Sequence, residues 1–346
     1  MAPPRVIAVP IRAADGFQRR NRIAGPAYGV VKKFGDDNAN LFVVALGWYG
    51  FTAIYPLLLV VVTVFGYIGA ASLGSGVVNT LHQFPVIGSE FRPGAGSNLH
   101  GSPVGLVIGL VGLIYGAQGV TQTAEQAMAG VWNVPASQRP GFLPRLLRSL
   151  SGLGIIGGGF LANAFLATVA AARGGSLGLR IGIIAGLCIL NVLLYAAAFR
   201  VLTPVDDKFR RFLPGAILGG VGFTALMTVG SGLIQHQLRH SSSTYGAFAA
   251  VIGVVTFLLL LSKLSLYAAE LNSVLARGLW PRALPTMPPT DADDRVLRAL
   301  TRQTHRRADE EIEVEFRPEP SARSSDGDGV TSSETPAVPD RRLTGS

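Results

Sequence analysis

The sequence predicts an all-α, polytopic membrane protein whose six transmembrane helices form one bundle, with both termini in the cytoplasm. Three observations lead to this fold class. Of the 346 residues, 49% are hydrophobic and only 15% are charged, whereas about a quarter of a typical soluble domain is charged. Long apolar runs recur along the chain. The Lys and Arg residues gather in alternate connections between those runs.

The N-terminal segment, 1–40, is basic and polar. Tyr28, Val31 and Phe34 recur at helical spacing beside two lysines, which is typical of a short helix lying on a membrane surface. The first apolar run is far longer than the core of a signal peptide, so we expect it to remain in the protein as a span.

The transmembrane domain is expected to occupy 41–276. Crossing about 30 Å of hydrocarbon takes about 20 helical residues, and in lipid only a helix satisfies every backbone polar group of such a run. Six segments meet this requirement, at about 41–70, 104–128, 149–172, 181–200, 213–235 and 245–276. Gly215 and Gly219 form a GxxxG pattern and glycines cluster from Gly152 to Gly159, which indicates closely packed helices.

The C-terminal segment, 277–346, is expected to be a largely disordered cytoplasmic tail. Its prolines would end the last helix, and residues 291–308 could form a small amphipathic helix through Val296 and Leu300. From Pro318 onward the chain is rich in Ser, Asp, Gly and Pro, a composition typical of disorder.

Basic residues set the expected orientation and partners. All but a few of the 30 Lys and Arg residues fall in the N-terminal segment, the second and fourth connections and the C-terminal segment. Because cytoplasmic loops carry this excess, we expect a multi-pass membrane protein with both termini in the cytoplasm. The same loops explain the net charge of +9, since no basic stretch is interleaved with aromatic residues. We expect lipid and a small solute or lipid ligand as partners, and no nucleic acid; a homo-oligomer is left open.

The second predicted span carries a polar stripe. Its first half is apolar, but four polar side chains then recur at helical spacing: Gln118, Gln122, Glu125 and Gln126. Facing lipid these groups would be costly, so we expect them to face the bundle interior or a water-filled cavity that opens inward. A plain hydrogen-bond seam between helices explains the stripe equally well. Asn163 and Asn191, each in mid-span, would join the same polar interior.

The last predicted span holds Lys263 and Glu270 on one helical face. An ionisable residue within a membrane is by default a functional hypothesis. Glu125 could pair with Lys263, since both lie in the cytoplasmic half of the predicted topology. Alternatively, Glu270 lies at the inner interface and Lys263 snorkels toward it.

The sequence carries no signature of an enzyme. It lacks a G-x-S-x-G elbow, a Walker A motif and a dinucleotide fingerprint. A nuclease is rejected too, because the acidic run from Asp309 to Glu315 falls in the tail. The single cysteine, Cys188, allows no disulfide framework, and His236 and His240 lack an HExxH motif or a carboxylate at ligand spacing. We therefore expect no catalytic residue, no cofactor and no metal.

Several stretches resemble one bacterial family. They are FGDDNANLFVVALGWYGFTAIYPLLL from Phe34, VWNV from Val131, FLPGA from Phe212, and TYGAFAAVIG leading into YAAELN from Tyr267. From about residue 34 to 276 the chain is similar to the YihY/BrkB family of inner-membrane proteins, once mislabelled ribonuclease BN. The resemblance implies a six-span protein of the bacterial inner (plasma) membrane whose molecular function is unsettled, sometimes proposed as a transporter.

The resemblance makes Glu270 a safer candidate than Lys263, which lies outside the family's pattern. Our first hypothesis is a protein that binds or transports a small solute or lipid through a polar intramembrane cavity. The residues expected to line this cavity are Gln118, Gln122, Glu125, Asn163, Lys263 and Glu270. The rival hypothesis is a non-transporting membrane scaffold or envelope-assembly component, in which the same polar groups only hold helices together. A membrane-embedded enzyme comes third.

Overall fold

The protein is seen here in a computed structural model that describes most of the chain before residue 317. The described residues are 15–68, 103–139, 141–172, 177–238, 246–285, 287–307, 309–310 and 312–316. The chain divides into two compact units, Met1–Ile312 and Glu313–Ser346. The disorder predicted from Pro318 onward lies outside the described residues.

The first unit is built from α-helices, and the described part of the chain contains no strand. Within the described residues, six helices have 26 residues or more. They are α3 (Ala39–Ile68), α5 (Pro103–Val131), α6 (Phe142–Ala172), α7 (Leu177–Leu202), α8 (Leu213–Leu238) and α9 (Gly246–Arg277). The shorter elements are α2 (Ala24–Asp36), α10 (Asp291–Gln303) and the 3-10 turns η3 (Ala136–Gln138) and η4 (Phe209–Phe212). The predicted all-α class is confirmed.

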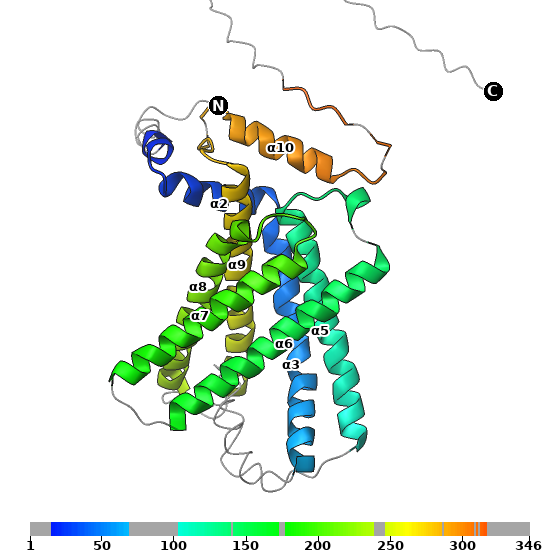
Figure 1. The fold of residues 1–346 in the computed structure, drawn as a ribbon, viewed down its shortest axis with the longest axis vertical. Coiled ribbons are helices and arrows are strands. Elements are labelled where there is room, and N and C mark those ends of the chain that lie inside the picture. The colour runs from blue at the N-terminus through cyan, green and yellow to red at the C-terminus, as the bar shows by residue number, and fades with distance from the viewer. Residues whose placement is uncertain are drawn as a thin grey trace, which may run out of the picture. The chain divides into compact units, whose positions relative to one another are not determined.

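The six long helices close a circuit of packed neighbours (Figure 1). Helix α3 packs against α5 and α9, α8 packs between α9 and α7, and α6 packs against α7 and α5. Each long helix therefore has a neighbour on two sides. The short helices α2 and α10 lie at one end of these helices, the end at which α5 and α9 terminate (Figure 1).

Within the described residues, four stretches are long and apolar enough to cross a membrane. They are Leu106–Val131, Ile181–Leu202, Phe209–Thr228 and Val251–Arg277, with a shorter apolar stretch at Ala39–Ile54. Helix α5 also exposes large apolar side chains along one face: Val107, Ile108, Val111 and Tyr115 are all exposed. Large exposed apolar surfaces mark sites of contact, and on apolar helices long enough to cross the hydrocarbon core the contact is with lipid. The chain is thus a membrane protein with at least these four apolar helices.

Glycines allow α8 to approach both of its neighbours closely. A Cβ atom on Gly215 would lie 2.0 Å from the carbonyl oxygen of Ala268 in α9, and one on Gly219 would lie 2.5 Å from the Tyr195 ring in α7. The GxxxG prediction of close helix packing is confirmed at both positions. The glycine cluster on α6 packs closely at its two ends, where a Cβ on Gly152 or Gly159 would lie 2.8 Å from a leucine side chain of α7, whereas a Cβ on Gly157 would meet nothing within 4 Å.

Helix α2 is the short N-terminal helix that the sequence predicts, but it packs on protein. Phe34 is buried and stacks on Tyr267 of α9 at 4.3 Å between ring centroids. Val31, one turn before Phe34, is 56% exposed and lies at the edge of the buried face. Lys33, expected beside the membrane surface, is fully buried. One face of α2 therefore contributes to the core of the unit.

The first part of the C-terminal segment is ordered. Helix α10 is the predicted amphipathic helix, and it begins with a capping box in which Thr290 and Asp293 bond each other's backbone N–H. Val296 is fully buried, and Leu279 of the linker and Val30 of α2 belong to the same apolar cluster. The linker and α10 thus belong to the folded unit, although the sequence predicted a largely disordered tail from 277.

Candidate functional site

A half-open pocket of about 140 Å³ lies where α5 ends and α6 begins. Its walls come from the end of α5, the residue after η3, the first turns of α6, and the end of α7 with Pro204 after it. The lining residues are Glu125, Gln126, Ala129, Arg139, Arg145, Arg148, Leu202 and Pro204. Three arginines and one glutamate leave this pocket with a surplus of positive charge.

Glu125 is the buried carboxylate of the pocket. Its residue is 8% exposed, and the hydroxyl of Ser149 donates a hydrogen bond to Glu125 Oε1 at 3.1 Å. Arg145 Nε lies 3.7 Å from Glu125 Oε2, too far for a hydrogen bond but close enough for attraction between the charges. Ser149 and Arg145 are one turn apart on α6. The first turns of α6 therefore provide both partners of Glu125.

The predicted pair of Glu125 and Lys263 is wrong. Glu125 pairs with Arg145 because α6 packs against this part of α5. Lys263 lies on α9 with an exposed side chain, and no ion pair among the described residues includes it. The alternative, in which Lys263 snorkels toward Glu270, fails as well, since the cation beside Glu270 is Lys33.

The glutamines of the predicted stripe do not all lie in one place. Gln126 lines the pocket with Glu125, whereas Gln118 is half-buried and Gln122 is exposed. The two adjacent residues, Glu125 and Gln126, both line the pocket, so direction around the helix does not divide the stripe. Gln118 lies seven residues before Glu125, about 10 Å away along the helix axis, so it lies too far from the end of α5 to line the pocket.

Asn163 and Asn191 form a separate polar seam between three helices. The Asn163 side-chain amide donates to Asn191 Oδ1 at 3.0 Å, and the Asn191 amide donates to the hydroxyl of Thr224 at 3.0 Å. These residues belong to α6, α7 and α8, and none lines the pocket. The seam satisfies polar groups between helices, as the hydrogen-bond alternative supposes for polar residues in spans.

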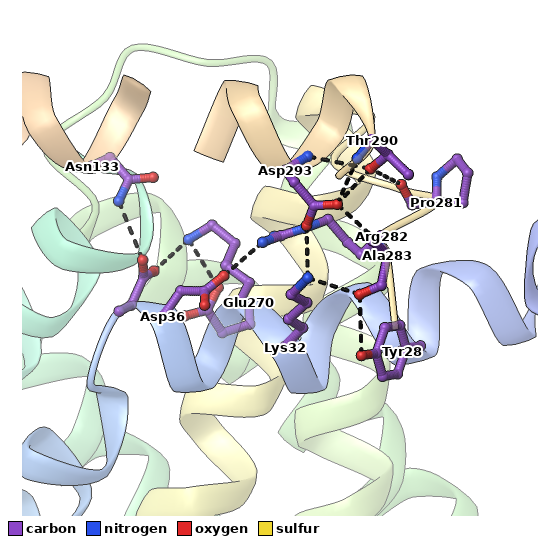
Figure 2. Close-up of polar contacts among 12 residues, drawn as sticks. Tyr28, Lys32, Asp36, Asn133, Glu270, Pro281, Arg282, Ala283, Thr290 and Asp293 are labelled. Carbon is purple, nitrogen blue, oxygen red and sulfur yellow. Dashed lines mark hydrogen bonds and ion pairs between the residues drawn. The ribbon is translucent and has the colours of Figure 1, made fainter. Parts of the chain in front are cut away.

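Glu270 lies in a second polar site under α2 (Figure 2). Lys33 Nζ is 3.1 Å from Glu270 Oε2, and both side chains are fully buried. Lys33 also forms an ion pair with Asp37 and donates to the Val131 carbonyl oxygen at 2.8 Å. One lysine thus joins α2, α9 and the end of α5. A buried charge persists only when such partners compensate its lost hydration.

The polar contacts continue from α2 into the linker and α10 (Figure 2). Arg282, with a nearly inaccessible side chain, bonds Asp36 Oδ2 and Asp293 Oδ1, each at 2.6 Å. Lys32 Nζ bonds Asp293 Oδ1 and the Ala283 carbonyl oxygen, each at 2.8 Å. We call Lys32, Asp36, Arg282 and Asp293 the clasp. The clasp fastens the C-terminal linker and α10 to α2.

The clasp alters the acid–base behaviour of Asp293. Burial alone would raise the pKa of its carboxyl group, but hydrogen bonds from Lys32, Arg282 and the backbone N–H of Ala283 and Thr290 outweigh that effect. The pKa of Asp293 is therefore held far below its ordinary value. Asp293 is the charged acceptor on which the clasp converges.

Several of these residues had no individual signal in the sequence. Arg139, Arg145 and Arg148 contributed to the predicted topology, but only the packing of α6 against α5 brings them to one pocket. Lys33 and Arg282 looked like ordinary basic residues of cytoplasmic segments. The described residues contain no group of three His, Cys, Asp or Glu side chains that could hold a metal ion.

Comparisons with known proteins place this fold in one family. No curated protein and no solved structure matches the chain. A family model described as "Virulence factor BrkB" matches residues 30–290. The matched region is most of the chain and includes the whole pocket, the buried Lys33 and Glu270, and all of the clasp except Asp293. The chain belongs to the virulence factor BrkB family.

Proposed function

We propose that this membrane protein spans the inner membrane six times, with both termini in the cytoplasm, and binds a small solute or lipid in the pocket at Glu125 as one step of its transport. The observation that carries this proposal is the pocket itself. It places a buried carboxylate and three arginines at the end of α5. A concave site with a few convergent polar groups is the usual form of a ligand site.

The proposed topology follows from the six long helices and the positions of the basic residues. Arg145 and Arg148 begin α6, Arg200 ends α7, and Arg210 and Arg211 precede α8. These positions lie at the same ends of the helices as α2, because α5 leads to α6, and α7 leads to α8, at that end (Figure 1). By the positive-inside rule that end is cytoplasmic, which makes the pocket accessible from the cytoplasm.

Glu125 is the proposed coupling residue. It is the carboxylate of the pocket, and its partners Ser149 and Arg145 belong to another helix. A small shift of α6 against α5 would change both contacts and thereby the affinity of the pocket. Coupling of ligand binding to relative motion of helices is the usual basis of alternating access.

The experiment uses a deletion strain, because the transported solute or lipid is identified by the change in its cellular amount when the protein is absent. Metabolite and lipid contents are profiled in the deletion strain and in strains that express the wild type, Glu125→Gln or Gln122→Ala from the same promoter. We expect wild type and Gln122→Ala to restore the profile, and Glu125→Gln to fail at equal membrane abundance. Full restoration by Glu125→Gln would remove this residue from the proposed mechanism.

A scaffold is the second candidate, favoured by the seam of Asn163, Asn191 and Thr224. These polar groups bond one another across three helices and line no part of the pocket. A scaffold would tolerate changes in the pocket but not in the seam. Restoration of the profile by Glu125→Gln, together with failure of Asn191→Leu at equal abundance, would favour the scaffold.

A further inference from the structure

We propose that the ligand of the pocket carries a phosphate group, which comes either from a phospholipid headgroup or from a phosphorylated solute. This inference rests on the proposed function, since it names the chemical class of the ligand. It starts from the charge of the pocket. Arg139, Arg145 and Arg148 line it, and Glu125 is the one acidic residue among its lining residues. The formal surplus is therefore two positive charges, which matches a phosphate dianion better than a single carboxylate.

The pocket arginines also have hydrogen-bond donors available for a phosphate. A guanidinium group has five N–H donors in a planar fork that fits two oxygens of a phosphate. Arg145 is attracted to Glu125 at 3.7 Å, beyond hydrogen-bond distance. The ion pairs found among the described residues include neither Arg139 nor Arg148. A bound phosphate would thus gain hydrogen bonds without breaking an existing ion pair of those two residues.

The size of the pocket limits the bound group. A volume of about 140 Å³ is well below the roughly 300–1,000 Å³ of sites for drug-sized ligands. It holds a compact group such as a phosphate with a short substituent. The remainder of a larger ligand would extend through the open side of the pocket.

The surroundings of the pocket suit the depth of lipid headgroups. Leu143, Leu147 and Leu150 recur at helical spacing on the first turns of α6, and all three are exposed. The pocket arginines Arg145 and Arg148 lie on the same turns, and both are half-buried. An apolar face beside arginines is typical of helices at a membrane interface. Phosphate groups of lipids lie at that depth, and phosphorylated solutes reach it from the cytoplasm.

The test is calorimetric titration of the purified full-length protein in detergent. The probes are inorganic phosphate, dihexanoyl phosphatidic acid, whose phosphomonoester headgroup can carry two negative charges, and, as its phosphate-free counterpart, dihexanoylglycerol. We expect saturable binding of a phosphate-bearing probe and no binding of dihexanoylglycerol. Saturation by the phospholipid alone identifies a headgroup site, and saturation by inorganic phosphate identifies a site that also accepts solutes. Absence of binding by both phosphate-bearing probes overturns the inference.

Variants connect the binding to the pocket. The double substitution Arg145→Gln/Arg148→Gln should weaken binding about tenfold or more, since hydrogen bonds to charged groups are lost. Arg145→Lys/Arg148→Lys keeps the charge and should recover part of the affinity, which excludes a simple folding defect. Arg210→Gln, an exposed arginine outside the pocket, is the matched control and should leave affinity unchanged. Equal affinity of the double glutamine variant and the wild type would overturn the inference.

Glu125→Gln separates this inference from the proposed function. Removal of the one pocket carboxylate raises the positive surplus, so phosphate should bind several-fold more tightly, whereas transport should be lost. Tighter phosphate binding with a restored cellular profile would contradict the transport proposal and leave the phosphate site standing. Failure of Glu125→Gln to restore the cellular profile, together with a wild type that binds no phosphate, would contradict the phosphate site and leave the transport proposal standing.

Discussion

At the scale of single residues, Lys33 is the buried cation that joins three helices through its polar partners. It is fully buried, and it faces Glu270 from α9 and Asp37 from the end of its own helix. Its third partner is the Val131 carbonyl oxygen at the end of α5. The attraction between these groups offsets the hydration that all of them lose on folding. Removal of the lysine alone would leave two buried carboxylates without their cation.

Lys33→Met should destabilise the protein by about 3–5 kcal/mol, the usual cost of breaking a buried ion pair from one side. The measurement is the thermal unfolding midpoint of the purified protein in detergent. Lys33→Met/Glu270→Gln removes one charge of each sign and should recover part of the loss. The pairing between Lys33 and Glu270 would be refuted by a double variant that is no more stable than Lys33→Met.

Asp293 should make stability depend on pH on the acid side. Its pKa in the folded protein is held far below the value of about 3.9 in an unfolded chain. A group of this kind stabilises the fold fully above the unfolded pKa, and the contribution is lost as pH falls toward the folded pKa. The unfolding midpoint of the wild type should therefore fall between pH 5 and pH 3.

The matched variants are Asp293→Asn and Asp294→Asn, which change neighbouring carboxylates of α10. Asp293→Asn should lower the midpoint at pH 7 and reduce its fall between pH 5 and pH 3. Asp294→Asn should behave like the wild type, because no ion pair among the described residues includes Asp294. An unchanged pH response in Asp293→Asn would show that the clasp does not depend on this charge.

The ion-pair partners of the buried glutamates were the feature of the site that the sequence predicted least well. Glu125 and Glu270 stood out because charge is rare in spans, and both are buried and paired. Their partners Arg145 and Lys33 did not stand out, because basic residues flank every cytoplasmic span end. Which basic residue folds back onto a span depends on the packing of α2 and α6, and spacing along the chain carries no information about that.

At the scale of elements, the contact between α8 and α9 depends on Gly215. A Cβ at this position would lie 2.0 Å from the Ala268 carbonyl oxygen and 2.5 Å from the Asn272 side-chain nitrogen. The backbone N–H of Gly215 also donates to Asn272 Oδ1 at 2.6 Å. Both partners belong to α9, and the carbonyl is backbone, so the helices themselves must move to admit a methyl group.

Gly215→Ala should therefore lower the unfolding midpoint, with a cost of about 1–3 kcal/mol for overpacking. Gly157→Ala is the matched control on α6, where a Cβ would meet nothing within 4 Å. It should leave the midpoint unchanged or raise it slightly, since Ala favours the helix by up to about 1 kcal/mol over Gly. The same decrease in both variants would mean that close approach at Gly215 is not the cause.

Elements with a strong local pattern were predictable. The apolar face of α10 and the spacing within α2 indicated both helices before their contacts were known. Their attachment to the rest of the unit was not predictable, because it depends on contacts between the two ends of the sequence. Arg282 and Asp36 are far apart along the chain, and they meet only after α9 has returned to the end of the bundle where α2 lies.

At the scale of the whole molecule, the proposed topology has a direct test. An alkaline phosphatase reporter, active only outside the cytoplasm, is fused after Leu238 or after Ser346. Six spans with both termini inside predict activity after Leu238, where α8 ends, and none after Ser346. A cytoplasmic reporter at the same positions should give the opposite pattern. Activity of the phosphatase after Ser346 would contradict the proposed topology.

The helical class and the positions of the long helices could be predicted because lipid restricts both composition and length. The six predicted spans fall on α3 and α5 to α9, although four of the described stretches meet the length and hydropathy expected of a span. The order of neighbours around the circuit could not be predicted. It depends on which small side chains face one another, as at Gly215 and Ala268.

The clasp also bears on how the protein can be shortened. The family match stops at residue 290, whereas Asp293, which receives both Lys32 and Arg282, lies just beyond it. A fragment trimmed to the matched region would keep Lys32 and Arg282 but lose Asp293, and Asp36 would be the one carboxylate of the clasp left to balance their charge. The family boundary is therefore not a safe place to cut this polypeptide, and expression of its membrane part should extend at least through Gln303, where α10 ends.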